Sequence, residues 1–204
     1  MVILGLTGSI AMGKSTIANM FRRLGVPVHD SDAEVHKLMG PKGAALAAVE
    51  AAFPGVVKNG AVDRAALGAR VFGKPDELRK LERILHPLVG QSREKFLRRE
   101  MMRGARIAVY DIPLLYEVGA DALCDAVVVV SAPAYLQRLR VLRRPGMSEE
   151  RLASILARQM PDAEKRRRAD FVVPTGLGKA FSLGHVKNIV ATAKLMHGRH
   201  WPPR

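Results

Sequence analysis

Short apolar runs alternate along the chain with segments whose apolar residues recur at helical spacing. The β-branched runs predict buried strands at residues 2–6, 26–29, 107–111 and 126–130, and at a fifth, weaker run, 171–173. The helical spacing predicts helices over residues 14–24, 133–143 and 149–160. Strands that alternate with helices favour an α/β fold, in which helices cover both faces of a parallel sheet.

Residues 32–103 follow a different pattern. They contain no run typical of a strand, but helix starts occur at Asp63, before "RAALGARVF", and at residues 74–76, before "ELRKLERIL". The stretch "FPGVVKNGA" is rich in proline and glycine and predicts a loop. The segment therefore predicts a helical insert between the second and third strands. At the other end of the chain, "HGRHWPPR" is expected to be frayed.

Charge and cysteine content narrow the class of protein. The formal net charge of +14 implies an anionic partner, which could be a nucleic acid, an acidic membrane surface or a polyphosphate. Cys124 is the only cysteine, so no internal disulfide can form, which fits a reducing cytoplasm. No basic leader precedes the first apolar run, and no apolar run reaches about 18 residues. We therefore expect a cytoplasmic protein with no membrane partner.

The stretch "GLTGSIAMGKST" lies between the first predicted strand and the first predicted helix. Within it, "GSIAMGKS" matches G-x-x-x-x-G-K-[ST], and the flanking strand and helix are the context expected of a phosphate-binding loop. The N–H groups of such a loop point at an anion, and the helix adds the positive end of its dipole. The pattern predicts nucleotide phosphates bound by this phosphate loop, namely Gly8, Ser9, Ile10, Ala11, Met12, Gly13, Lys14, Ser15 and Thr16.

Individual residues of the phosphate loop have expected roles. Gly8 and Gly13 allow the backbone to turn. Lys14 places its charge against the β- and γ-phosphates and is expected to face solvent when no ligand is bound, while the Ser15 hydroxyl is the expected Mg²⁺ ligand. A tight glycine turn without phosphate is the structural alternative. The loop alone does not distinguish a kinase from a GTPase, a motor or a transporter ATPase.

Four aspartates follow or precede the predicted strands. Because ligands bind at the carboxyl ends of parallel strands, Asp30, Asp32 and Asp111 can face the phosphates, whereas Asp125 belongs at the opposite end of the sheet. Asp111 could hold the Mg²⁺ shell through water or be a surface acid. One of Asp30 and Asp32 is expected to be a catalytic base, and the other a cap for the helix starting near Ala33.

Arginines crowd the ends of two predicted helices, in "QRLRVLRR" and "EKRRR". Arg140 and Arg144 stand four residues apart on one helix face, where their repulsion favours a compensating anion. They indicate a mobile lid that closes on a triphosphate, and we expect both side chains to be exposed when no ligand is bound. For residues 166–168 a solvated basic face is an equal alternative. A nucleic-acid-binding protein is disfavoured, because the basic residues do not form a stripe interleaved with aromatics.

Seven stretches resemble, in family order, signatures of the dephospho-CoA kinases: "GLTGSIAMGKST", "DSDAEVHKLM", "AVDRAALGARVF", "LERILHPLV", "DIPLLYEVG", "LRVLRRPGMSEE" and "RQM…RRRADFVV". They cover residues from about 3 to 175. The resemblance implies ATP-dependent phosphorylation, with Mg²⁺, of the ribose 3′-hydroxyl of dephospho-CoA, the last step of coenzyme A synthesis. Another P-loop kinase that acts on a nucleotide or nucleoside is the alternative, and a nucleic-acid-binding P-loop NTPase is a more distant one.

The resemblance also implies a P-loop three-layer fold in three parts. Residues 1–31, 104–134 and 170–204 would form the nucleotide-binding core, residues 32–103 a helical substrate domain, and residues 135–169 a mobile lid. The expected partners are ATP and dephospho-CoA, with no nucleic acid, and the sequence leaves the oligomeric state open.

Site residues follow from the family motifs. Asp32 matches the acid that faces the acceptor hydroxyl, and Arg140 and Arg144 match lid arginines. The resemblance implies that further residues bind the substrate, namely Arg64, His86, Pro113, Leu114, Leu115 and Glu117. The alternative for His86 is a residue that ends a helix before Pro87.

The chain departs from the family pattern at four positions. Ser9 and Ala11 stand where the family usually has glycine, Pro145 replaces an acidic residue after the lid arginine, and Thr175 replaces an asparagine near the adenine. Phosphate loops often need a positive φ at the position of Ala11, which suits glycine. We therefore expect either a strained Ala11 or a different path of the loop.

Overall fold

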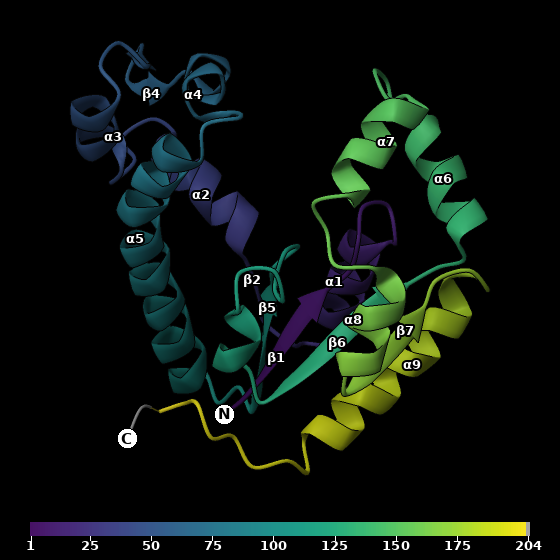
Figure 1. Cartoon of the computed structure of the whole chain (residues 1–204). Helices are drawn as coiled ribbons and strands as arrows, with labels where there is room; N and C mark the ends of the chain where they lie inside the picture. The colour runs from purple at the N-terminus through teal and green to yellow at the C-terminus, as the bar shows by residue number, and fades with distance from the viewer. Residues whose placement is uncertain (203–204) are drawn as a thin grey trace. The chain divides into compact units, whose positions relative to one another are not determined.

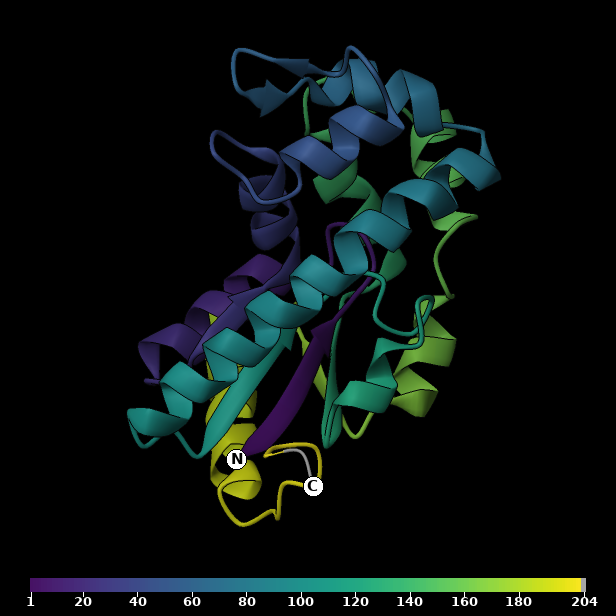
Figure 2. The same ribbon diagram turned by 90° about the vertical axis from the view of Figure 1, so that its left-hand side faces the viewer.

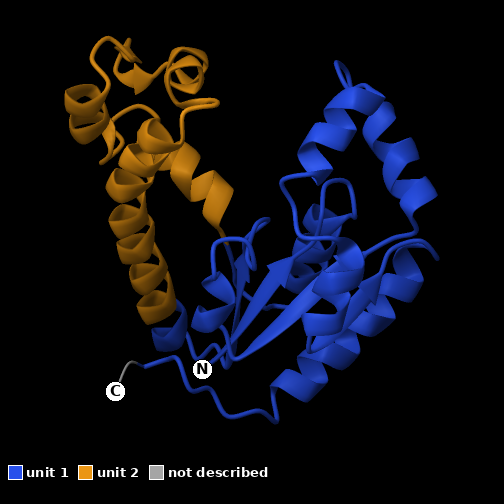
Figure 3. Ribbon diagram, in the orientation of Figure 1, with its two compact units in different colours: residues 1–29, 100–204 blue, residues 30–99 orange. Residues whose placement is uncertain are grey.

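The structure is a computed structural model in which residues 1–202 are described. The chain divides into two compact units, one made of residues 1–29 and 100–204 and the other of residues 30–99 (Figure 3). The segment 135–169 lies within the first unit. No helix of the described residues is both long and apolar enough to cross a bilayer.

A five-stranded sheet forms the centre of the first unit (Figure 1). Its strands lie in the order β2-β5-β1-β6-β7, and their bounds are Val28–Asp30, Ile107–Asp111, Val2–Thr7, Ala126–Ser131 and Phe171–Pro174. Strand β1 runs parallel to both neighbours, with Val2 opposite Ile107 and Leu4 opposite Ala126. Every residue of β1, β5 and β6 is buried, which explains why their apolar runs are continuous. The predicted α/β fold is confirmed.

Helices cover both faces of this sheet. Helices α1 (Lys14–Arg23) and α9 (Lys179–Ala193) pack against each other, and their apolar residues join those of β1 and β6 in one core. Helix α8 (Asp162–Arg168) contacts β6 and lies in front of the strands in Figure 1, whereas α9 lies behind them. Helices α6 (Ala134–Leu142) and α7 (Glu149–Leu156) form the segment between β6 and α8.

The second unit is mainly helical and has its own core. It contains α2 (Ser31–Met39), α3 (Leu46–Ala52), α4 (Arg64–Val71) and most of α5 (Pro75–Met102), whose last residues belong to the first unit. Apolar side chains from these helices pack together, among them Leu38, Val49, Phe53, Leu67 and Leu81. The unit therefore buries an apolar core of its own, distinct from that of the sheet.

One part of this unit differs from the expected loop. The stretch "FPGVVKNGA" leads into an antiparallel hairpin of β3 (Val57–Lys58) and β4 (Ala61–Val62). Asn59 and Gly60 connect the two strands with φ angles of 51° and 75°. Two successive positive φ angles are those of a type I′ turn, for which Asn-Gly is the favoured pair. The prediction of a loop without strands was wrong because this turn signal was not used.

The helix predictions need five corrections. Helix α7 ends at Leu156, four residues before its predicted end, and the individual helices α3, α8 and α9 were not predicted. Helix α5 continues through Pro87, so the interpretation of His86 as a helix-ending residue is wrong. A proline inside a helix removes one hydrogen bond, and here buried residues on both sides of it, Leu85 and Leu97, keep the helix continuous.

The described part of the C-terminal segment is not frayed. The Trp201 side chain is buried, and its carbonyl accepts a hydrogen bond from the N-terminal ammonium of Met1 at 3.3 Å. The Asp125 carboxylate accepts from the N–H of Arg199 at 2.6 Å and from that of Ile3 at 2.7 Å. Figure 2 shows this yellow segment passing the start of β1. Asp125 thus lies at the end of the sheet opposite the phosphate loop, as predicted, and residues 203–204 of the predicted tail lie outside the described residues.

Candidate functional site

The phosphate loop connects the carboxyl end of β1 to α1, and its two glycines serve different purposes. Gly13, just before α1, has a φ of 100°, a conformation that suits glycine. The φ of Gly8 is outside the left-handed region, but a Cβ there would lie 2.6 Å from the carbonyl oxygen of Val130. Gly8 therefore allows the loop to approach β6 closely. Ala11 has a φ of 59°, so of the two expected outcomes the strained residue is the one observed.

Lys14 forms an ion pair with Asp111, the last residue of β5. The Lys14 side chain is 17% exposed and the Asp111 side chain 3%. The expectation that Lys14 faces solvent without a ligand, and the interpretation of Asp111 as a surface acid, are both wrong. A buried carboxylate requires a compensating partner, and the flexible lysine stem lets the ammonium reach one. Ser15 and Thr16 are exposed in the first turn of α1.

The two arginines that the sequence assigns to a lid differ in their surroundings. Arg144 is exposed, as expected. Arg140 is half-buried, because its guanidinium donates to the carbonyl of Ala11 at 3.3 Å and to that of Thr175 at 2.7 Å. The prediction that Arg140 is exposed without a ligand is therefore wrong. Its partners are the strained residue of the phosphate loop and the residue after β7.

Two glutamines also contact the phosphate loop, and sequence reasoning missed both. Gln137 donates to the carbonyl of Ile10 at 2.9 Å, and Gln159 accepts from the N–H of Ile10 at 3.1 Å. Gln137 is buried although it lies on α6 among basic residues. A buried amide within a charged helix is a signal only once burial is known, so the sequence alone did not single it out.

The segment after β5 carries the predicted substrate-binding residues Pro113, Leu114, Leu115 and Glu117. Leu114 is exposed, whereas Leu115 is fully buried, and a Cβ at Gly5 would lie 2.6 Å from its Cδ1. The carbonyl of Pro113 accepts from the Thr7 hydroxyl at 2.9 Å. Within this motif, Leu115 is therefore a core residue, whereas the side chain of Leu114 is accessible from solvent.

Glu117 is bound to the segment that follows α7. Its Oε1 accepts from the N–H of Met160 at 2.8 Å and lies 2.8 Å from Nζ of Lys165. The Lys165 side chain is 0% exposed and that of Glu117 is 16%. Burial opposes ionisation of Glu117, but the bonds from Lys165 and Met160 outweigh it and hold the pKa below its usual value. Lys165 was not singled out from the sequence, and only the fold shows that it is buried.

Four of the predicted residues lie in the second unit, namely Asp30, Asp32, Arg64 and His86. The Asp30 carboxylate accepts from the N–H of Ala33 at 2.9 Å and caps α2, so Asp30 is the cap of the predicted pair. Asp32 is exposed in the first turn of α2. Arg64 lies 3.1 Å from Nε2 of His36, a contact that was not predicted, and His86 is exposed on α5.

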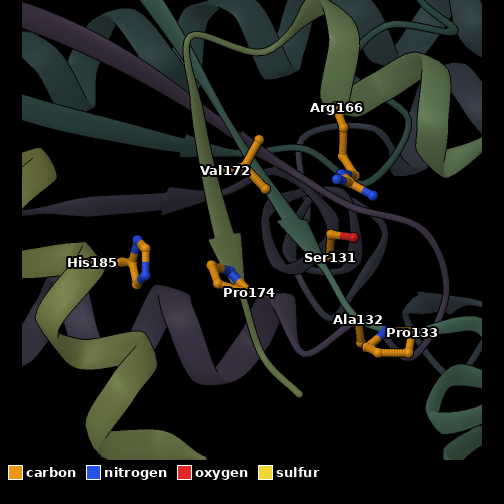
Figure 4. Close-up of a pocket in the computed structure, with 7 residues that line it drawn as sticks. All are labelled: Ser131, Ala132, Pro133, Arg166, Val172, Pro174 and His185. Atoms are coloured by element: carbon orange, nitrogen blue, oxygen red, sulfur yellow. The ribbon is translucent and has the colours of Figure 1, made fainter. Parts of the chain in front are cut away.

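A pocket of about 400 Å³ lies at the carboxyl ends of β6 and β7 (Figure 4). Its lining residues come from β6, the turn after it, α8, β7 and α9, and they are Ser131, Ala132, Pro133, Arg166, Val172, Pro174 and His185. Within residues 1–202, no residue of the phosphate loop lines this pocket. It is therefore distinct from the loop.

A parallel sheet whose first strand leads through G-x-x-x-x-G-K-S into a helix, with a buried acid paired to the loop lysine, is the arrangement of a P-loop nucleotide-binding protein. The family model for dephospho-CoA kinase matches residues 2–177. A dephospho-CoA kinase of Mesorhizobium japonicum is 57% identical over 190 residues, which are 93% of this chain and 95% of that one. The chain therefore belongs to the dephospho-CoA kinase family, and its activity is the final step of coenzyme A biosynthesis.

Solved structures agree with this assignment. The crystal structure of TT1252 from Thermus thermophilus has a TM-score of 0.81 and 34% sequence identity, and the match covers 96% of this chain and 98% of that one. The dephospho-CoA kinase from Campylobacter jejuni has a TM-score of 0.59 and 25% identity, with 94% of this chain and 96% of that one covered. The family, the fold and the kinase activity predicted from the sequence are confirmed.

Proposed function

We propose that this kinase transfers the γ-phosphoryl group of ATP to the ribose 3′-hydroxyl of dephospho-CoA in the cytoplasm. The observation that carries the donor side of the proposal is the phosphate loop, which opens α1 with Lys14 beside a buried acid. The acceptor is supported by membership of the family. Cys124 is buried and is the only cysteine, so the chain has no internal disulfide, which fits the proposed compartment.

The donor phosphates are bound by the loop's N–H groups and by Lys14, which leaves Asp111 when the triphosphate arrives. Arg140 and Arg144 neutralise the charge of the transferred group when the lid closes. For Arg140 this requires an exchange of partners, because its guanidinium is hydrogen-bonded to Ala11 and Thr175.

The residues around Lys14 also fit a bound Mg²⁺ ion. Ser15 offers an exposed hydroxyl in the first turn of α1, and Asp111 offers a buried carboxylate beside the loop. Among the described residues no group of three or more His, Cys, Asp or Glu side chains forms a metal site, so the ion would share phosphate oxygens and water with these two. When bound, Mg²⁺ neutralises charge on the β- and γ-phosphates.

Asp32 is the proposed catalytic base on the acceptor side. A ribose hydroxyl is a poor nucleophile at neutral pH, and a carboxylate within hydrogen-bond reach accelerates its attack. Asp30 is already used as the cap of α2, whereas Asp32 is exposed, which supports the choice between the two. Arg64, His86, Leu114 and Glu117 are the proposed acceptor contacts, with Pro113 and Leu115 supporting the backbone of that segment.

Substitution of the two aspartates tests the proposal. We expect Asp32→Asn to lower kcat by about 10²–10⁴, with ATP binding unchanged. Asp30→Asn keeps a capping side chain and is the matched control, with kcat within about twofold. A dead Asp30→Asn with an active Asp32→Asn would exchange the roles. Normal turnover by both variants would mean that no base is needed.

A substrate panel tests the donor and acceptor together. ATP turnover that depends on dephospho-CoA supports the proposal. Turnover with nucleosides or nucleotides in its place would favour a different acceptor, and stimulation by DNA or RNA would favour a nucleic-acid-dependent NTPase.

A further inference from the structure

The three carbonyl groups at the apex of the phosphate loop all accept hydrogen bonds from side chains of other segments. The three bonds are Gln137 Nε2 to Ile10 O (2.9 Å), Arg140 NH1 to Ala11 O (3.3 Å) and Thr175 Oγ1 to Met12 O (2.6 Å). Gln137 and Arg140 lie on one face of α6, and Thr175 follows β7. These side chains form what we call the loop clamp, together with Gln159.

Gln159 binds the other backbone polar group of Ile10, the N–H. Its Oε1 accepts from the N–H of Ile10 at 3.1 Å. The neighbouring N–H, of Met160, donates to Glu117 at 2.8 Å, so the position of Gln159 is itself fixed. The carbonyl of Ile10 is therefore bound by Gln137 on α6, and its N–H is bound by Gln159 in the segment after α7.

Fixing these carbonyls also fixes the direction of the amides that bind an anion. In a planar trans peptide the C=O group and the N–H of the next residue point in opposite directions. Carbonyls of Ile10 and Met12 that are held by the clamp therefore turn the N–H groups of Ala11 and Gly13 away from it. An array of such N–H groups is what a phosphate loop offers to an anion.

The clamp also explains how Ala11 keeps its conformation. A φ of 59° is unfavourable for alanine by roughly 1 kcal/mol, and such strain persists only where the surroundings fix the backbone. Arg140 holds the carbonyl of Ala11 itself, and Thr175 holds the next one. The guanidinium of Arg140 also donates to the Thr175 hydroxyl at 3.1 Å, which links these two members of the clamp.

We propose that Gln137, Gln159 and Thr175 are positioning residues that hold the phosphate loop in its anion-binding conformation before ATP arrives. The inference rests on the proposed binding of the donor phosphates by this loop. A loop that is already ordered loses less conformational entropy on binding, so Gln137, Gln159 and Thr175 tighten ATP binding without taking part in the transfer step. The clamp also joins the loop to both ends of the lid.

A glutamine-to-glutamate substitution at each of the two positions distinguishes the effect of losing a hydrogen-bond donor from the effect of adding a negative charge. Gln137 must donate to a carbonyl, so Gln137→Glu removes the donor and sets a carboxylate against an oxygen. Gln159 must accept from an N–H, so Gln159→Glu keeps its acceptor. Both variants add one negative charge near the loop. Any general repulsion of the triphosphate is therefore common to them.

The first experiment measures the dissociation constant of a non-hydrolysable ATP analogue with Mg²⁺. We expect Gln137→Glu to bind it about tenfold more weakly than Gln159→Glu, the effect of losing one hydrogen bond and leaving a carbonyl unpaired. Amide hydrogen exchange of residues 10–13 in the ligand-free protein should be faster in Gln137→Glu alone. Equal affinities and equal exchange rates in the two variants would overturn the proposal.

The second experiment uses Thr175. Thr175→Val keeps the shape and removes the hydroxyl, whereas Thr175→Ser keeps the hydroxyl and serves as the control. We expect Thr175→Val to raise KM for ATP about fivefold to tenfold while kcat at saturating ATP stays within about threefold. Thr175→Ser should restore the wild-type KM. A lower Tm with unchanged KM would indicate a merely structural role and overturn the proposal.

Lys14→Ala distinguishes failure of the clamp from failure of the proposed donor binding. If wild type binds the analogue no more tightly than Lys14→Ala, the loop does not bind the donor and the proposed function fails. If Lys14→Ala weakens binding but the clamp variants do not, the function stands and the clamp proposal fails.

Discussion

The ammonium group of Lys14 in the phosphate loop and the carboxylate of Asp111 at the end of β5 form an ion pair that is largely shielded from solvent. The pair joins the two strands on which the donor site depends, because β1 leads into the loop and β5 lies beside β1 in the sheet. Lys14 is therefore a structural residue in the ligand-free protein as well as the proposed phosphate-binding charge.

Lys14→Ala should affect stability as well as activity. We expect turnover to be abolished and ATP binding weakened, because the point charge on the β/γ-phosphates is lost. Removing one partner of a buried pair leaves the other charge uncompensated, so the free energy of unfolding should fall by about 3 kcal/mol. Urea denaturation of the ligand-free protein measures this. Lys37→Ala, which removes an exposed lysine, is the control and should change stability by less than about 0.5 kcal/mol.

Glu117→Gln should make stability depend on pH in a defined direction. The pKa of Glu117 in the folded protein lies below its usual 4.5, so ionised Glu117 stabilises the fold above that pH. This contribution is lost as the pH falls through the lower, folded-state pKa. The difference in free energy of unfolding between wild type and Glu117→Gln should therefore be largest near neutral pH and shrink in acid.

Glu94→Gln is the control for the pH series, because Glu94 is paired with Arg98 on the surface of α5. Surface pairs of this kind contribute less than about 1 kcal/mol, so its difference from wild type should stay small at every pH. A Glu117→Gln difference that remained constant down to about pH 3 would contradict the assigned direction of the shift.

Gly8→Ala tests the close approach of the phosphate loop to β6. A Cβ at Gly8 would lie 2.6 Å from the Val130 carbonyl oxygen, which belongs to a buried strand and cannot move freely. We expect a loss of about 1–3 kcal/mol in the free energy of unfolding, together with weaker ATP binding. Gly184→Ala in α9 is the control, because its Cβ meets nothing within 4 Å, and it should stabilise the protein by about 0.5–1 kcal/mol. An unchanged Gly8→Ala protein would mean that the loop can shift away from β6.

The local sequence pattern predicted the features that are determined within one continuous segment, namely the strands and the phosphate loop. The central strands β1, β5 and β6 were predictable because they are covered on both faces, which leaves continuous apolar runs in the sequence. The phosphate loop was predictable because its residues are consecutive. Strain at Ala11 was one of two outcomes expected there, because phosphate loops often need a positive φ at this position.

The missed features depend on contacts between distant residues. Lys165 looks like its exposed neighbours in a basic run, and only the docking of α8 against the sheet buries it beside Glu117. The clamp residues Gln137 and Thr175 come from segments nearly forty residues apart, and neither residue type signals a loop contact. The Trp201 segment likewise has no periodicity of its own, and its order comes from Asp125 and the chain's first residues.

Arg144 tests the donor-side assignment of the lid. Arg144 lies in the bend just beyond the end of α6, and Arg140, on the last turn of that helix, already contacts the phosphate loop. In the proposed function, the exposed Arg144 side chain reaches the transferred phosphoryl group when the lid closes. We expect Arg144→Ala to lower kcat about 10²-fold, the usual effect of removing one donor to developing charge.

Steady-state kinetics with each substrate varied in turn measure this effect, and Arg143→Ala is the matched control. Arg143 is also exposed and carries the same charge, and it directly precedes Arg144 as the C-cap residue of α6. Its loss should leave kcat within about twofold, so long-range electrostatics are accounted for. KM for dephospho-CoA should stay nearly unchanged in both variants. If Arg144→Ala instead raised only that KM, Arg144 would bind the acceptor, and the lid would close on dephospho-CoA rather than on ATP.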